Sequence, residues 1–128
     1  MKECYINIIT ETIDGKQEFS ASGFFSFFRQ KAEIKYKDGT SFVKIAVRGG
    51  LIKIVRQGDY NLDMLFANGK TTQAYLSISE EKSCIPLNTL HATYDGVEEE
   101  SINIELNYSL AMTDKPTDYK VKIFVKSK

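Results

Sequence analysis

Residue types that mark common functional sites are scarce in this 128-residue chain, which has no tryptophan, one histidine and two cysteines. Cys4 and Cys84 are too far apart in the sequence to have the spacing of a zinc-binding motif. His91 on its own supplies neither a metal site nor a Ser-His-Asp arrangement. With no catalytic or metal-binding signature to point to, we expect a protein that is not an enzyme and that holds no metal and no cofactor.

An excess of positive charge is also missing, since Lys+Arg and Asp+Glu both number 17 and the formal net charge is zero. A chain without a basic stripe is poorly suited to the phosphate backbone of nucleic acid or to an anionic membrane. The segment from Met1 to Ile8 lacks the apolar core of a secretory signal, and no apolar run approaches the roughly 20 residues of a membrane-spanning helix. We therefore expect a cytoplasmic protein with reduced cysteines, and neither nucleic acid nor membrane as a partner.

The sequence does contain a long run of alternating apolar and polar residues, between Ile102 and Met112. The even-numbered residues of this run are apolar or aromatic, and the odd-numbered ones are mostly polar. This period of two is typical of a half-buried β-strand whose even-numbered side chains face a core. No segment has the spacing of a convincing amphipathic helix, so we expect an all-β protein.

Turn-forming sequences interrupt the alternation along the whole chain. Six are dipeptides that contain glycine: Asp14-Gly15, Asp38-Gly39, Gly49-Gly50, Gly58-Asp59, Asn68-Gly69 and Asp95-Gly96. Three more breaks lie at Phe28–Gln30, Ser79–Ser83 and Asp114–Thr117. Nine turns imply about ten strands, and closing so large an antiparallel sheet removes its exposed edges. We predict one domain over residues 1–128, a closed antiparallel meander β-barrel of about 8–10 strands.

Tight turns also predict which residues face one another across each hairpin, and residues that face one another share a face of the sheet. Two-residue turns at the first three dipeptides pair Ile8 with Ala21, Ile34 with Val43, and Val47 with Ile52, and a three-residue turn follows Gln57. The same reasoning at Asn68-Gly69 puts Tyr75 opposite Leu62 on the inner face, with Gln73 one inward step below. The outer face would then carry Leu65, Ala67, Ala74 and Leu76.

Two residues predict local irregularities in the strands. Gly23 interrupts an aromatic strand and indicates a sharp bend at a barrel corner. Pro86 lies in the run from Cys84 to Tyr94 and cannot donate a ladder hydrogen bond, so this strand should be an edge or contain a bulge.

A set of short motifs in the middle of the chain resembles a known family. The motifs are Arg56-Gln57-Gly58, Met64-Leu65-Phe66, Gly69-Lys70-Thr71-Thr72 with Tyr75, and Tyr108-Ser109-Leu110. Together they resemble the YwiB-like family of small uncharacterised bacterial proteins, over most of the chain from Asp14-Gly15 onward. The resemblance implies a lipocalin-like (calycin-like) barrel and no established activity or ligand. The chain departs from the family after Tyr75, where Ile78 to Ser83 replaces an expected Tyr-Gly turn.

Arg56 stands out because the hairpin at Gly49-Gly50 places it opposite Val43, on the apolar inner face. A buried unpaired charge costs several kcal/mol, so this guanidinium needs a carboxylate, water or an anionic ligand. The same barrel end should gather Tyr36, Tyr75 and Tyr119. A cation among hydroxyl groups suits a carboxylate or phosphate headgroup with apolar space beneath. The predicted ligand-binding residues are therefore Arg56, Tyr75, Gln73, Tyr36 and Tyr119.

Two functions follow from this hypothetical mouth. The first is a non-enzymatic binder of a small hydrophobic or amphipathic anion, with a cavity that runs from Arg56 into the core. The alternative is a structural or protein-interaction barrel with a filled core and no small ligand. One form of this alternative is a homodimer that associates through the outer face. In that alternative Arg56 pairs with loop acids such as Asp59, Asp114 or Asp118. An enzyme using Arg56 and Tyr75 ranks last, because no general base is identifiable.

Overall fold

The computed structural model describes residues 1–128, which form ten β-strands and no helix. The strands are β1 (Lys2–Thr12), β2 (Gly15–Phe28), β3 (Lys31–Asp38), β4 (Ser41–Arg48), β5 (Leu51–Gln57), β6 (Tyr60–Phe66), β7 (Thr71–Ile78), β8 (Glu81–Val97), β9 (Ser101–Leu110) and β10 (Thr117–Ser127). Each strand pairs antiparallel with the next, and β1 pairs with β10. The predicted closed meander barrel is thereby confirmed. No helix capable of crossing a lipid bilayer is found.

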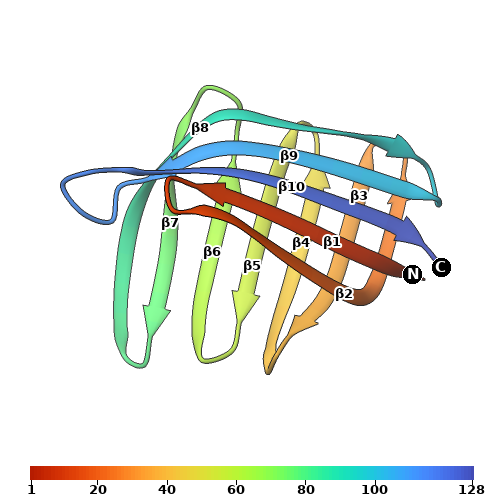
Figure 1. The fold of residues 1–128 in the computed structure, drawn as a ribbon, viewed down its shortest axis with the longest axis horizontal. Coiled ribbons are helices and arrows are strands. Elements are labelled where there is room, and N and C mark those ends of the chain that lie inside the picture. Colours follow the sequence, from red (N-terminus) through yellow and green to blue (C-terminus); the bar gives the residue numbers. More distant parts are fainter.

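The barrel is flattened into two layers whose strands cross at a steep angle (Figure 1). One layer contains β9, β10 and β1, and the other contains β3 to β7. The two longest strands, β2 and β8, pass from one layer to the other. Gly23 is the point at which β2, already paired with β1, begins to pair with β3. A Cβ there would overlap the Lys35 carbonyl oxygen, so the corner requires glycine.

The interior is filled by a cluster of 24 buried apolar side chains drawn from every strand. Ile102, Ile104 and Leu106 of β9 are fully buried, which confirms that the even-numbered residues of this strand face inward. The strand ends at Leu110, however, and Met112 is exposed in the following loop, so the predicted strand was two residues too long.

Strand β8 accommodates its proline and also contains a bulge. Pro86 pairs with Gln73 of β7 and precedes Leu87, the first residue of β8 that pairs with β9. The missing N–H of Pro86 therefore does not interrupt the ladder with β9. The bulge falls between Thr89 and His91, where the extra residue Leu90 is mostly exposed.

Two predicted hairpin registers are wrong by two residues, because the turns begin one residue away from the predicted dipeptide. Ile8 pairs with Phe19 rather than Ala21, and Ile34 pairs with Ile45 rather than Val43. A shift of two residues leaves every side chain on its predicted face, since the side-chain period is two. The pairing of Val47 with Ile52 is confirmed, as is the three-residue turn after Gln57.

Candidate functional site

Arg56 lies on the inner side of β5 near one barrel end and is already paired with an acid. Its Nη1 donates a 2.9 Å hydrogen bond to Oδ2 of Asp38 at the end of β3. Its guanidinium also stands 5.2 Å from the centre of the Tyr60 ring. The prediction that Arg56 pairs with Asp59, Asp114 or Asp118 is therefore wrong. The charge of Arg56 is compensated inside the protein by a residue two strands away.

The ionisable groups of this mouth, Arg56, Asp38 and Tyr36, together carry no net charge at neutral pH. The hydrogen bond to Asp38 raises the pKa of Arg56 further, so the guanidinium stays charged. Burial raises the pKa of Tyr36 to about 12, with a further upward contribution from Asp38 and an opposing one from Arg56. At neutral pH the mouth therefore holds one ion pair and a neutral phenol, and no free positive charge for a ligand.

A hollow of about 580 Å³ opens beside the mouth. Its walls come from β1, β2 and β3 and consist of Ile8, Thr10, Gln17, Glu18, Phe19, Tyr36 and Asp38. Arg56 is not part of these walls, whereas the carboxylates of Glu18 and Asp38 are. Two acidic side chains make this hollow a poor site for the anionic headgroup that the sequence suggested.

Tyr75 and Gln73 do not lie on the inner face, so the predicted mouth loses two of its residues. The connection between β6 and β7 changes the register by one residue, and Tyr75 pairs with Asp63 instead of Leu62. A one-residue shift moves every side chain of a strand to the opposite face. Tyr75 is 54% exposed on the outer wall, and Gln73 is exposed as well.

The same shift removes the predicted outer apolar face. Ala74 is fully buried in the core and Leu76 packs against the core from inside. Ala67 is also buried, at the start of the connection between β6 and β7. Of the four residues expected on that face, only Leu65 remains on the outside, as the partner of Lys53.

Tyr119 faces the interior as predicted, but it belongs to an aromatic stack. Its ring is 5.1 Å from that of Tyr108 at an interplanar angle of 15°, and Tyr108 meets Phe66 edge-on at 4.8 Å. Burial, followed by the neighbouring Tyr119, raises the pKa of Tyr108. Tyr119 thus fills the barrel, and the structure joins only Tyr36 and Arg56 in the predicted mouth.

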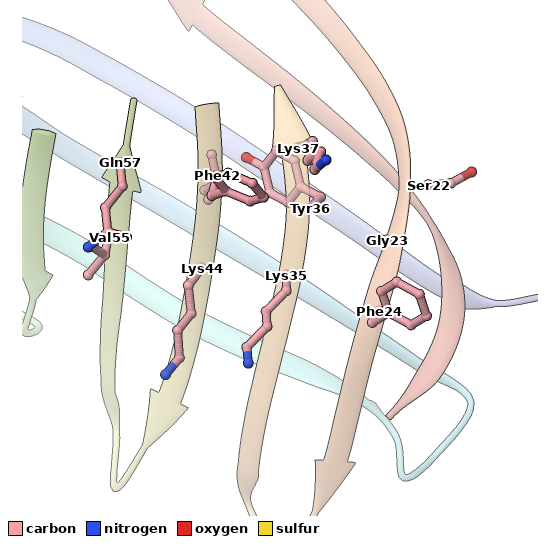
Figure 2. Close-up of a pocket in the computed structure, with 11 residues that line it drawn as sticks. Ser22, Gly23, Phe24, Lys35, Tyr36, Lys37, Phe42, Lys44, Val55 and Gln57 are labelled. Atoms are coloured by element: carbon pink, nitrogen blue, oxygen red, sulfur yellow. The ribbon is translucent and has the colours of Figure 1, made fainter. Parts of the chain in front are cut away.

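A larger hollow of about 730 Å³ lies on the outer wall of strands β2 to β5 (Figure 2); we call it the outer groove. Its side chains form two register rows across the strands: Phe24, Lys35, Lys44 and Val55 in one, and Lys37, Phe42 and Gln57 in the other, with Ser22 beside them on β2. Between the rows lie Gly23, Tyr36 and Val43, which belong to the inner face of the sheet. The groove therefore has backbone at its floor and long side chains around it.

The outer groove combines exposed aromatic rings with an excess of positive charge. Phe24 and Phe42 are 49% and 57% exposed. Lys35 and Lys44 share the carboxylate of Glu33 at 3.2 and 3.4 Å, and Lys37 has no carboxylate partner. Its Nζ stands 5.0 Å from the centre of the Phe42 ring.

Glu33 is held in its charged form by its two lysine partners. Burial acts to raise the pKa of Glu33, but the hydrogen bonds and charges of Lys35 and Lys44 outweigh it and lower the pKa overall. Three ammonium groups against one carboxylate leave the groove with two more positive than negative charges. One signal of this site is present in the sequence: Phe24 and Phe25 are adjacent in a strand, and two adjacent residues cannot both face the core. One of the two phenylalanines therefore has to lie on the outer wall.

A family model for a domain of unknown function, DUF1934, matches residues 6–123. The chain belongs to this family. A solved structure, described as the crystal structure of the ywiB protein from Bacillus subtilis, has the same fold, with a TM-score of 0.81 and 20% sequence identity over 98% of this chain and 90% of that one. The resemblance to the YwiB-like family is thus confirmed. No curated protein matches the sequence.

Both hollows of this DUF1934 domain lie within the matched residues. No group of three or more His, Cys, Asp and Glu side chains is arranged to hold a metal ion. Cys4 is buried and Cys84 is exposed, and both are free thiols. Burial raises the pKa of Cys4, which keeps its thiol protonated and unreactive.

Proposed function

We propose that this protein is a non-catalytic binding protein for a small amphipathic anion and that the outer groove holds the ligand. The observation that carries the proposal is the placement of Lys37, which has no carboxylate partner, beside the exposed ring of Phe42, with the exposed ring of Phe24 in the same groove. A volume of about 730 Å³ falls within the usual range for small-molecule sites. An apolar body would contact the rings while its charged group meets the lysines.

The other hollow supports this choice by contrast. Its walls carry two carboxylates, and the cation beside it is bound to one of them. The core is occupied by 24 buried side chains, which leaves little room for an apolar tail inside the barrel. The outer groove, in comparison, has both the charge and the exposed apolar surface that an amphipathic anion requires.

The groove chemistry supports binding without catalysis. Its walls contain lysines, aliphatic and aromatic side chains, one serine and one glutamine, with no histidine or carboxylate positioned as a general base. Glu33, the carboxylate in contact with the groove lysines, is engaged by two ammonium groups. A site of this composition can hold and orient an anion, and it places no histidine or carboxylate beside its serine.

Isothermal titration with matched pairs of compounds tests the proposal. Each pair shares one apolar body and differs in its charge, for example 1-naphthoate against 1-naphthalenemethanol. We expect heat of binding from the anion alone and loss of most of the affinity in Lys37→Gln. Lys82→Gln is the control, because Lys82 is an exposed lysine of β8 outside the groove. Equal affinity of the two lysine variants, or equal binding of the alcohol, would refute an anion site in the groove.

The second candidate function is a structural or protein-interaction barrel, with a homodimer as one form of it. The filled interior supports this alternative, because every strand contributes side chains to one continuous core. Analytical ultracentrifugation over a range of concentrations, together with a negative titration, would favour it over the small-molecule binder.

A further inference from the structure

The two exposed phenyl rings of the outer groove stand apart from each other. Phe24 stands on β2 and Phe42 on β4, in different rows, so two strand spacings or roughly 10 Å separate their backbones across the sheet. The lysines Lys35 and Lys44 lie in the row between Phe24 and Val55. Between the two rings lies the backbone of Gly23, Tyr36 and Val43, so each ring rises from the floor of the groove on its own.

This arrangement discriminates between shapes of apolar ligand. A flexible alkyl chain gains most when it is enclosed on all sides, and it loses rotational freedom when it is bound. A flat ring instead stacks one whole face on an exposed phenyl group without an enclosing cavity and with little entropy to lose. The wall of β2 to β5, where Phe24 and Phe42 stand on separate strands (Figure 2), therefore favours a planar aromatic body.

The charge of the groove also discriminates between headgroups. The lysines exceed the single carboxylate of Glu33 by two charges, and only Lys37 lacks a carboxylate partner. A phosphate monoester carries about −1.5 to −2 charges at neutral pH and offers three acceptor oxygens. It can thus contact Lys37 and reach a second ammonium group at once, whereas a carboxylate carries only one charge.

We infer that the ligand of the outer groove is a planar aromatic phosphate monoester, of which a mononucleotide is one biological form; this rests on the proposed function. In the free protein the Lys37 ammonium lies over the Phe42 ring. A ligand ring stacked on Phe42 replaces that contact and releases the ammonium for the phosphate. The phosphate of a nucleotide lies one sugar away from its base, which places it beside the lysines when the base covers the ring.

Three phosphate compounds separate ring shape from charge: 1-naphthyl phosphate, adenosine 5′-monophosphate and octyl phosphate. By titration calorimetry at low salt we expect both aromatic phosphates to bind about tenfold tighter than octyl phosphate, the advantage of roughly one stacked ring. Adenosine without phosphate should not bind measurably. Octyl phosphate binding as tightly as the aromatic compounds would overturn the inference and leave the anion-binding function intact. If none of the three phosphate compounds binds, and Lys37→Gln changes the binding of no anion, both this inference and the proposed anion-binding function are refuted.

Phe42→Leu tests the stacking surface against a matched control. Phe28 is also an exposed phenylalanine with a cation over its ring, Arg29 at 5.1 Å, but it lies outside the groove. We expect Phe42→Leu to weaken 1-naphthyl phosphate at least about fivefold, and Phe28→Leu to leave its affinity unchanged. Because both side chains are exposed, both variants should fold, which circular dichroism verifies. Equal losses in the two variants would overturn the assignment of the ring site.

A hexathymidylate with and without a 5′-phosphate distinguishes a free mononucleotide from the end of a nucleic-acid strand. We expect adenosine 5′-monophosphate to bind at least as tightly as the phosphorylated hexamer, since the charges of the chain balance overall and give no track for further phosphates. Tight binding of the hexamer lacking the 5′-phosphate would overturn the monoester inference in favour of single-stranded nucleic acid.

Discussion

Arg56 on β5 reaches past β4 to Asp38 on β3, and its Nη1 atom hydrogen-bonds Oδ2 of Asp38 at 2.9 Å. The pair links two strands that have no ladder between them and lies where the barrel end would otherwise expose an inward cation. Its place is partly solvated, since the two side chains are 23% and 39% exposed. The same contact that ties β3 to β5 also removes Arg56 as a free receptor for an anion.

The first prediction concerns the contribution of this pair to stability. Arg56→Met should lower the free energy of unfolding by about 1 to 2 kcal/mol, less than a fully buried pair because Asp38 can turn to water once its partner is gone. Urea unfolding of wild type, Arg56→Met, Asp38→Asn and the double variant gives the coupling energy between the two side chains. A coupling energy near zero, or an Arg56→Met variant as stable as wild type, would contradict a structural role for the pair.

The second prediction concerns the core at β9. Leu106→Ala should lower the free energy of unfolding by about 2 to 5 kcal/mol, because the side chain is fully buried and its removal leaves a cavity. Glu105→Ala, on the outer face of the same strand, should change it by less than about 0.5 kcal/mol. Chemical denaturation measures both. A Leu106→Ala loss below about 1 kcal/mol would mean that the strand faces the other way.

The third prediction concerns the corner of β2. An added methyl group at Gly23 would overlap the carbonyl oxygen of Lys35 and come within 2.9 Å of Cδ1 of Ile6. Gly23→Ala should therefore destabilise the barrel by about 1 to 3 kcal/mol or more, as overpacked cores do. Ser22→Ala is the neighbouring control on the exposed face. Thermal unfolding that shows both variants equal to wild type would mean that the corner can relax around a methyl group.

Most of the fold follows from the sequence because period-two alternation and glycine turns are local signals. The predicted register between β6 and β7 is wrong although the tight turn forms at Asn68-Gly69, where the Lys70 N–H donates to the Ala67 carbonyl oxygen at 3.0 Å. Between this turn and the pair of Asp63 with Tyr75, the β7 side contains one residue more than the β6 side. Asn68 is held at this turn by hydrogen bonds with both the backbone N–H and the carbonyl oxygen of Ala92 on β8. These bonds join residues 24 positions apart, so no local reading of the chain could anticipate them.

The candidate sites were harder to predict for a related reason. The inward position of Arg56 follows from one hairpin, but Asp38 becomes its partner only when β3, β4 and β5 are aligned side by side, and the predicted β3–β4 register was two residues off. The outer groove depends on four strands at once and on how they bend around Gly23. Exposure of a given aromatic ring is likewise a property of the assembled wall, although parity alone places Phe24 and Phe42 outside.

The last prediction concerns Tyr36 and alkaline pH. Burial raises its pKa to about 12, against about 10 for a tyrosine in an unfolded chain. The folded state therefore retains the phenol proton at pH values where the unfolded state releases it. Its contribution to stability is fully present below about pH 10 and is lost as the pH rises toward 12.

Tyr36→Phe removes this pH dependence without removing the ring. Between about pH 9 and pH 12 the wild type should lose about 1 to 2 kcal/mol more unfolding free energy than Tyr36→Phe, with part of the remaining loss due to Tyr108, whose pKa is raised as well. Urea unfolding at stepped pH measures the difference, and Tyr75→Phe controls for the loss of one hydroxyl on the outer wall. Parallel stability curves for wild type and Tyr36→Phe would show that Tyr36 ionises as readily in the folded barrel as in the unfolded chain, and hence that the mouth admits water to its hydroxyl.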